Sequence, residues 1–174
     1  DMAFTHNQIR DFNRLVGKLR DNNIYIPVKH AANSMGLIDF KDSHMNMVRP
    51  GLMMYGIYPK ENLMKNILLK PALTLKTKIT YLKSMPKGRS ISYGMTYVTR
   101  KPTKIATIPV GYGDGYSRHF SNKSQVLING VRCPVAGRVC MDMCMVDVGH
   151  LKNVKVGNVV VLIGSQGNEI FRAE

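Results

Sequence analysis

The sequence predicts an α/β segment followed by an all-β segment. Over the first sixty residues, helical and strand-like patterns alternate, which is typical of a parallel α/β sheet. From about residue 71 the apolar residues instead recur with period two, and glycine and proline separate short runs. These two observations predict a boundary at residues 70/71, with an α/β part over residues 1–70 and a β-rich part over residues 71–174.

The α/β part is expected to begin with a helix at Thr5, because Thr5 and Gln8 have the spacing of a capping box. Its apolar stripe is Ile9, Phe12, Val16 and Leu19. A strand over residues 24–34, a small helix over 35–42 and a second strand over 45–56 should follow. Two strands cannot bury a parallel sheet by themselves, so this part is expected to be incomplete.

The β-rich part is expected to be a compact antiparallel barrel or sandwich. "ALTLKTKITYL" alternates over residues 72–82 and predicts one strand with a wet face. Asn129-Gly130 is a strong hairpin signal. Residues 60–69 are expected to form a linking helical turn. Further strands are predicted at 103–110, 124–128, 131–135, 144–148 and 158–164.

Composition limits the function classes. The net charge is +14, but the lysines are scattered, which favours a solvated basic face over a nucleic-acid groove. No apolar run is long enough to cross a bilayer, and no signal sequence is recognisable, so no membrane partner is expected. The three cysteines are expected to be reduced thiols of a cytoplasmic protein. The chain does not begin with methionine, so a piece of a longer protein is expected.

Polar residues follow both predicted parallel strands, where ligands of α/β proteins usually bind. After the first come His30 and Ser34, and after the second come Arg49 and Gly51. A serine hydroxyl with free backbone amides nearby would suit a phosphate. The plainer alternatives are a helix cap for Ser34, a surface ion pair for Arg49 and a structural histidine for His30.

Three stretches of the β-rich part invite a functional interpretation. In "GRSISYGMTYV", Tyr93 is either a half-buried strand aromatic or a residue with a functional hydroxyl. "IPVGYGDGYSR" lacks the spacing of a nucleotide-binding loop, and a tight turn is favoured. In "GRVCMDMCM", Cys140, Asp142 and Cys144 would share one face of a strand, but zinc-site spacing is absent and no metal is expected.

Five segments in register resemble the alanine racemases. They are "HAANS" (30–34), "NMVRPGLMMYG" (46–56), "SYGMTY" (92–97), "IPVGYGDGY" (108–116) and "GRVCMDMCM" (137–145). The resemblance implies the last βα units of a TIM-like (β/α)₈ barrel over residues 1–70, and a β-rich C-terminal domain, truncated at its end, over residues 71–174.

The resemblance also implies an activity: racemisation of L-alanine and D-alanine with pyridoxal 5'-phosphate, which supplies D-alanine for the cell wall. The family works as a cytoplasmic homodimer. Its cofactor-bearing lysine has no counterpart here, so the chain alone is expected to be inactive and unable to bind the cofactor covalently. The alternatives are a serine or broad-spectrum racemase, a decarboxylase of the same fold, and a basic β-barrel binding module.

Residue roles follow from the resemblance by position. Tyr93 would be the second catalytic base, acting on the face opposite the lysine and across the dimer interface. Other roles fall into three groups. The cofactor phosphate would be bound by Ser34, Gly51 and Leu52, and the pyridine nitrogen would face Arg49, which His30 orients. The substrate would meet the Met141 N–H and pass Tyr112 at the entrance, with Arg138 and Asp142 as channel or supporting residues.

Overall fold

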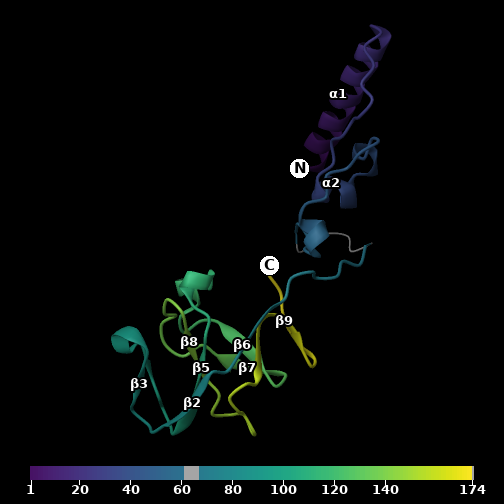
Figure 1. The fold of residues 1–174 in the computed structure, drawn as a ribbon. Helices are drawn as coiled ribbons and strands as arrows, with labels where there is room; N and C mark the ends of the chain where they lie inside the picture. The colour runs from purple at the N-terminus through teal and green to yellow at the C-terminus, as the bar shows by residue number, and fades with distance from the viewer. Residues whose placement is uncertain (61–66, 174) are drawn as a thin grey trace. The chain divides into compact units, whose positions relative to one another are not determined.

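The computed structural model describes residues 1–60 and 67–173 (Figure 1). Backbone contacts divide the chain into two units, Asp1–Ala72 and Leu73–Glu174, and each unit is described by itself. Most of the helical turn predicted at residues 60–69 lies outside the described residues. None of the described helices is both long enough and apolar enough to traverse a bilayer.

The first unit opens with α1 (Met2–Asp21), which starts earlier than predicted. The Asp1 carboxylate caps the helix by accepting a bond from the Phe4 N–H at 3.2 Å. Thr5 lies one turn inside the helix and donates its hydroxyl to the Asp1 carbonyl, so the predicted cap at Thr5 is wrong. The apolar stripe is confirmed, because Ile9 is buried and the other three residues are partly buried.

The two strands predicted in the first unit are wrong. Among the described residues of this unit no strand is assigned, although one backbone bond joins the Arg49 N–H to the Ala32 carbonyl at 2.9 Å. A parallel strand needs a continuous ladder with a neighbour, and a single bond does not make one. The small predicted helix is confirmed as α2 (Ser34–Asp39). The 3₁₀ turns η1 (Lys41–Ser43) and η2 (Leu52–Tyr55) complete the unit.

The second unit is built from antiparallel strands, as predicted. One sheet has the order β1-β9-β6-β7, with β10 also paired to β9, and a second has the order β2-β5-β8. A small pair, β3 with β4, stands apart. The bounds are β1 (Leu75–Lys78), β2 (Tyr81–Met85), β3 (Ser90–Ile91), β4 (Tyr97–Val98), β5 (Thr103–Ile108), β6 (Gln125–Ile128), β7 (Val131–Pro134), β8 (Cys144–Asp147), β9 (Val159–Gln166) and β10 (Glu169–Phe171).

Local patterns predicted some of these elements and misjudged others. The Asn129-Gly130 hairpin is confirmed: both residues have positive φ, 52° and 76°, and they connect β6 to β7. The single strand predicted over residues 72–82 is wrong, because β1 pairs with β9 whereas β2 pairs with β5 in the other sheet. The chain changes sheets at Ile79 and Thr80, and the buried Ile79 side chain joins the core there.

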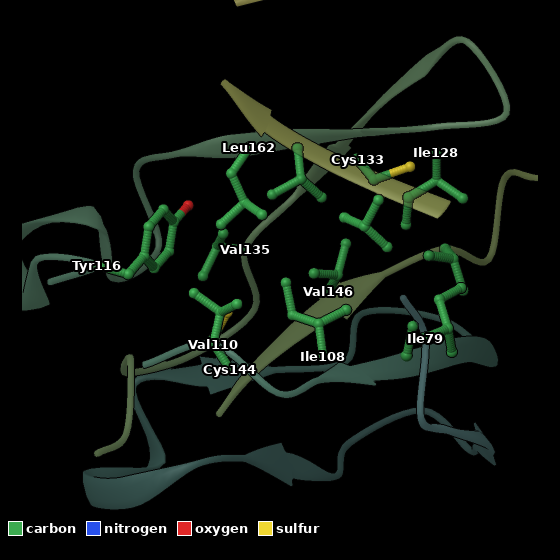
Figure 2. Close-up of a cluster of buried hydrophobic side chains, with 14 of the residues drawn as sticks. Ile79, Ile108, Val110, Tyr116, Ile128, Cys133, Val135, Cys144, Val146 and Leu162 are labelled. Carbon is green, nitrogen blue, oxygen red and sulfur yellow. The ribbon is translucent and has the colours of Figure 1, made fainter. Parts of the chain in front are cut away.

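The main apolar core of the second unit lies between its two larger sheets (Figure 2), and a smaller cluster of Ile91, Ile105 and Ala136 lies beside it. Fully buried side chains come from β5, β6, β8 and β9. In β6 and β9 three consecutive residues are buried, so both faces of these strands are covered there. An isolated bridge between Val135 and Val146 links the end of β7 to β8, and so connects the sheets by backbone as well as by packing. The loops that carry the candidate site extend from this rigid body.

Candidate functional site

The buried Ser34 hydroxyl organises a small polar site in the first unit. Asn33 takes the cap of α2, accepting bonds from the Met35 and Gly36 N–H groups at 3.1 and 3.0 Å. Ser34 is therefore not the cap, and its hydroxyl oxygen accepts a bond from the Gly51 N–H at 2.8 Å. Within the described residues, no acceptor pairs with the Leu52 N–H at the start of η2. The Ser34 hydroxyl and the free Leu52 amide are thus both found at the N-terminal end of η2.

Arg49 and His30 form a second polar pair in the same unit. The Arg49 Nη1 atom contacts the His30 Nδ1 atom, and both side chains are exposed. Arginine has only donors, so the Arg49 N–H donates this hydrogen bond and the unprotonated Nδ1 atom of His30 accepts it. This contact fixes one side of the guanidinium and leaves its other N–H groups able to donate elsewhere. No acidic partner of Arg49 occurs in the described residues, so the predicted alternative of an ion pair is not observed.

The second unit presents a cavity of about 450 Å³ beside Tyr93. Tyr93 starts the 3₁₀ turn η3 (Tyr93–Met95) between β3 and β4, so it is not a strand residue, and its side chain is 72% exposed. The predicted residues Met141 and Asp142 line the same cavity. Cys140 and Ser92 line it too, and the Cys140 sulfur lies 3.5 Å from the Ser92 hydroxyl oxygen. Within the described residues, no acceptor pairs with the Met141 N–H.

Tyr112 is held next to Met141 by backbone contacts. Its N–H donates to the Cys140 carbonyl at 3.0 Å, and the Gly113 N–H donates to the Met141 carbonyl at 2.8 Å. A Cβ atom at Gly111 would lie 2.1 Å from the Met141 oxygen, so only glycine permits this approach. The "GYGDGY" motif is thus a tight turn, as predicted, and it supports the loop that lines the cavity.

Arg138 lies against the turn that carries Tyr93. A Cβ atom at Gly94 would be 3.3 Å from the Arg138 Cζ atom, so the guanidinium packs directly over this glycine. In the second unit, three predicted residues therefore line one cavity: Tyr93, Met141 and Asp142. Arg138 packs against the turn that carries Tyr93, and Tyr112 lies beside Met141. The first unit separately brings together Ser34, Gly51 and Leu52, and pairs His30 with Arg49.

The thiols of the second unit have mainly packing roles. Burial raises the pKa of Cys133 and of Cys144 to about 12, so both remain protonated at neutral pH. Residues 137–143 form a loop and β8 begins only at Cys144, so the predicted strand face shared by Cys140, Asp142 and Cys144 is wrong. Across residues 1–60 and 67–173, no group of three His, Cys, Asp or Glu side chains is arranged to hold a metal ion.

Comparisons with known proteins agree along the chain. The family described as "Alanine racemase, N-terminal domain" matches residues 1–59, and "Alanine racemase, C-terminal domain" matches residues 72–174. The chain belongs to the alanine racemase family. An alanine racemase of Halothermothrix orenii is 52% identical over 99% of this chain, and one of Methanococcus maripaludis is 47% identical over 100%.

Solved structures of the family confirm the predicted fold class. An alanine racemase of Clostridium difficile in complex with cycloserine has a TM-score of 0.90 at 37% identity, over 97% of this chain. One of Bacillus anthracis with bound L-Ala-P has a TM-score of 0.89 at 35% identity, over 99%. The chain spans less than half the length of these relatives, between 44% and 47%. Below, "the complete protein" denotes a protein of the relatives' full length that contains this chain.

Two polar groupings of the second unit were missed from the sequence. Ser92 adopts φ 65° and ψ −176° immediately before Tyr93, and nothing in residue type or spacing indicated this. Asp147 accepts bonds from the Tyr97 phenol at 2.7 Å, the Thr103 hydroxyl at 2.6 Å and the Gly149 N–H at 2.9 Å. An aspartate within the apolar run "CMVDV" was a usable signal, because a carboxylate between buried apolar residues needs partners.

Proposed function

We propose that the complete protein racemises L-alanine and D-alanine with pyridoxal 5'-phosphate, and that this chain supplies two parts of the active site. Tyr93 carries the proposal, because its phenol borders a cavity next to the free N–H of Met141. The division at residues 70/71 would then separate a barrel segment that binds the cofactor from a β domain that acts on the substrate. The lysine that anchors the cofactor would come from the part of the complete protein that this chain does not span.

The polar site around Ser34 fits the phosphate of the cofactor. Its open donors are the Ser34 hydroxyl proton and the Leu52 amide, while the Gly51 amide donates to the Ser34 oxygen and so orients the hydroxyl. Gly51 also lets a ligand approach the backbone, because a Cβ atom built there meets only the Ser34 hydroxyl, at 3.9 Å. Backbone amides and hydroxyls of this kind suit a phosphate dianion. Ser34, Gly51 and Leu52 would therefore hold the cofactor at this end.

Arg49 would face the pyridine nitrogen of the cofactor, with His30 holding the guanidinium in place. When bound, pyridoxal phosphate withdraws electrons from the α-carbon of an amino acid and so acidifies its α-hydrogen. Arginine retains its proton at all ordinary pH values, so Arg49 can donate a hydrogen bond to the ring nitrogen without protonating it. Arg49 would in this way moderate electron withdrawal and limit side reactions.

Tyr93 would exchange a proton with one face of the α-carbon while the lysine serves the other face. Inversion at carbon requires removal on one side and delivery on the other, and two bases achieve this directly. The Met141 N–H would bind the substrate carboxylate, while Tyr112 would line the entrance. Arg138 and Asp142 would shape the channel, because Asp142 lines the cavity and Arg138 packs over Gly94.

The surroundings of Tyr93 suit a site that a second subunit completes. Besides the exposed Tyr93, three methionines of this region are exposed: Met95 by 71%, Met141 by 57% and Met143 by 45%. Such a cluster of apolar side chains is typical of a surface that another subunit covers. A homodimer with Tyr93 acting across the interface is therefore part of the proposal. The family resemblance adds to the proposal that the enzyme works in the cytoplasm and supplies D-alanine for the cell wall.

Racemisation by the complete protein tests this function. The protein is loaded with pyridoxal phosphate, and loss of optical rotation is followed with L-alanine, D-alanine and L-serine in turn. Rapid loss with both alanine enantiomers and little with serine is expected. Faster racemisation of serine would assign the chain to the serine or broad-spectrum alternative, and no racemisation of either amino acid would contradict the proposal.

A further inference from the structure

We propose that Ser92 is a positioning residue for Tyr93. Its hydroxyl would fix the backbone from which the catalytic phenol projects. This inference rests on the proposed function of Tyr93, but the tether itself is a property of the chain that can be measured without catalysis. Ser92 is absent from the residues to which the family resemblance gave a role.

The backbone around Tyr93 is held in a conformation that side chains disfavour. Ser92 has φ 65° and ψ −176°, a region occupied almost only by glycine. Two and three residues later, Gly94 and Met95 also have positive φ values, 69° and 48°. Conformations of this kind persist only when surrounding contacts enforce them, and they concentrate at functional sites.

The contacts that enforce this conformation come from the loop of residues 137–143. The Ser92 hydroxyl donates to the Arg138 carbonyl at 2.7 Å, and its oxygen lies 3.5 Å from the Cys140 sulfur. On the same side, a Cβ atom at Gly137 would lie 2.6 Å from both the Ile91 carbonyl oxygen and the Ser92 Cβ atom. The half-buried side chain of Ser92 is therefore bonded to this loop on one side and packed closely against Gly137.

The exposure of Tyr93 explains why such an anchor matters. Its side chain is 72% exposed, so packing within the described chain restrains the ring very little. The direction of the phenol then depends mainly on the backbone that carries it. Glycine would adopt the φ of Ser92 with less strain, so the conformation alone does not call for a side chain. A hydroxyl adds a bond to Arg138 that glycine cannot make.

The test measures α-hydrogen exchange in deuterium oxide by the complete protein loaded with pyridoxal phosphate. The variants are Ser92→Ala, which keeps the strain without the hydroxyl, and Ser92→Gly, which relieves the strain without the hydroxyl. Ser165→Ala, at an exposed position on β9, is the matched control. Because Tyr93 is assigned to L-alanine and the lysine to D-alanine, the two enantiomers report the two faces separately.

Both Ser92 variants should lower exchange from L-alanine on the order of 10- to 100-fold, because misplacement of a catalytic group by about 1 Å has effects of this size. Exchange from D-alanine should stay within about twofold of wild type, and the loss should lie in kcat with KM little changed. Equal losses for both enantiomers would overturn the proposal, since they would indicate general damage. Wild-type exchange from L-alanine in Ser92→Gly would overturn it as well.

Amide hydrogen exchange of residues 92–96 separates this inference from the proposed function. Loss of the bond to Arg138 should speed exchange of this segment on the order of tenfold in Ser92→Ala but not in Ser165→Ala. If the wild-type protein racemises neither alanine nor serine, the proposed function fails. Amide exchange would still show whether the bond from Ser92 to Arg138 holds the backbone of residues 92–96. An unchanged exchange rate at residues 92–96 would contradict the tether even in an active enzyme.

Discussion

The Tyr97 phenol donates a hydrogen bond of 2.7 Å to the Asp147 carboxylate, which joins β4 to β8 across fifty residues of sequence. Burial, followed by the bond to Asp147, raises the pKa of the phenol to about 12. For Asp147, burial opposes ionisation, but the bonds from Thr103, Tyr97 and Gly149 outweigh it and lower the pKa below its ordinary value of 3.8. The ionised carboxylate is thus the form that this network stabilises.

Asp147→Asn should destabilise the complete protein in a way that disappears in acid. The folded pKa is lowered, so the stabilisation is fully present above the ordinary value and is lost as pH falls through the lowered folded value. We expect a loss of about 1–2 kcal/mol at neutral pH, since the carboxylate accepts several bonds but is partly exposed. Urea unfolding between pH 7 and pH 3 measures the difference from wild type.

The matched control for this prediction is Asp11→Asn, which removes an exposed pair with Arg14 on α1. Surface pairs of this kind contribute little. A difference between Asp147→Asn and wild type that stays constant from pH 7 to pH 3 would show that the carboxylate charge is not what the network stabilises.

Gly137→Ala should destabilise the complete protein more than Gly88→Ala. The two glycines have nearly the same φ, 86° and 82°, so the backbone strain of an alanine is matched. A Cβ atom at Gly137 would overlap the Ile91 carbonyl and Ser92, whereas nothing lies within 4 Å of one at Gly88. The overlap should cost about 1–3 kcal/mol beyond the control. Urea midpoints of the two variants decide this, and equal midpoints would contradict the close contact.

Local patterning predicted the β-rich unit well because short apolar runs bounded by glycine, proline and polar residues mark most of its strands. In β6 and β9 the apolar residues reached the core as expected, and Asn129-Gly130 formed its hairpin from conformational preference alone. The failures share another cause. The strands expected in the first unit lack the neighbours that a ladder needs, and the pattern within a strand carries no information about its partners.

The candidate site was harder to predict because its geometry depends on distant contacts. The roles of Tyr93 and Met141 came from motif resemblance and remain predictions. That Tyr93 lies on a turn, next to a serine tethered 46 residues away, could not be read from period or composition. Residue type identified the chemistry, and the loop-to-loop contacts that fix its direction required the structure.

Ser34→Ala should weaken cofactor binding by the complete protein more than it weakens the fold. The variant removes the hydroxyl that lies with the Gly51 amide, and a bond to a charged phosphate is worth about 1.5–3 kcal/mol, or roughly 10- to 100-fold in Kd. Ser43→Ala is the control, because Ser43 is equally buried but bonds only to the Phe40 and Gly36 carbonyls. Equilibrium dialysis with pyridoxal phosphate measures the Kd of each variant, and urea unfolding measures the stability of each. Equal losses in the two variants would remove Ser34 from the phosphate site.

Tyr93→Phe should separate the two faces of the reaction. The equilibrium constant between L-alanine and D-alanine is one, so kcat/KM for racemisation must be equal in the two directions. Steady-state racemisation therefore cannot report one base alone. Exchange of the α-hydrogen with deuterium oxide can, because each enantiomer presents its hydrogen to one base. We expect exchange from L-alanine to fall on the order of 100- to 10,000-fold, the usual contribution of a general base, while exchange from D-alanine persists.

Tyr81→Phe provides the control for this experiment, since it removes a phenol that is 57% exposed on β2. It should leave both exchange rates at wild-type values. Because Tyr93→Phe keeps the ring and removes only the oxygen, the backbone of the turn should be undisturbed, and a selective loss can be assigned to proton transfer. If L-alanine and D-alanine lose exchange equally in Tyr93→Phe, then Tyr93 is not the base for one face, and the two-base mechanism needs a different partner for the lysine.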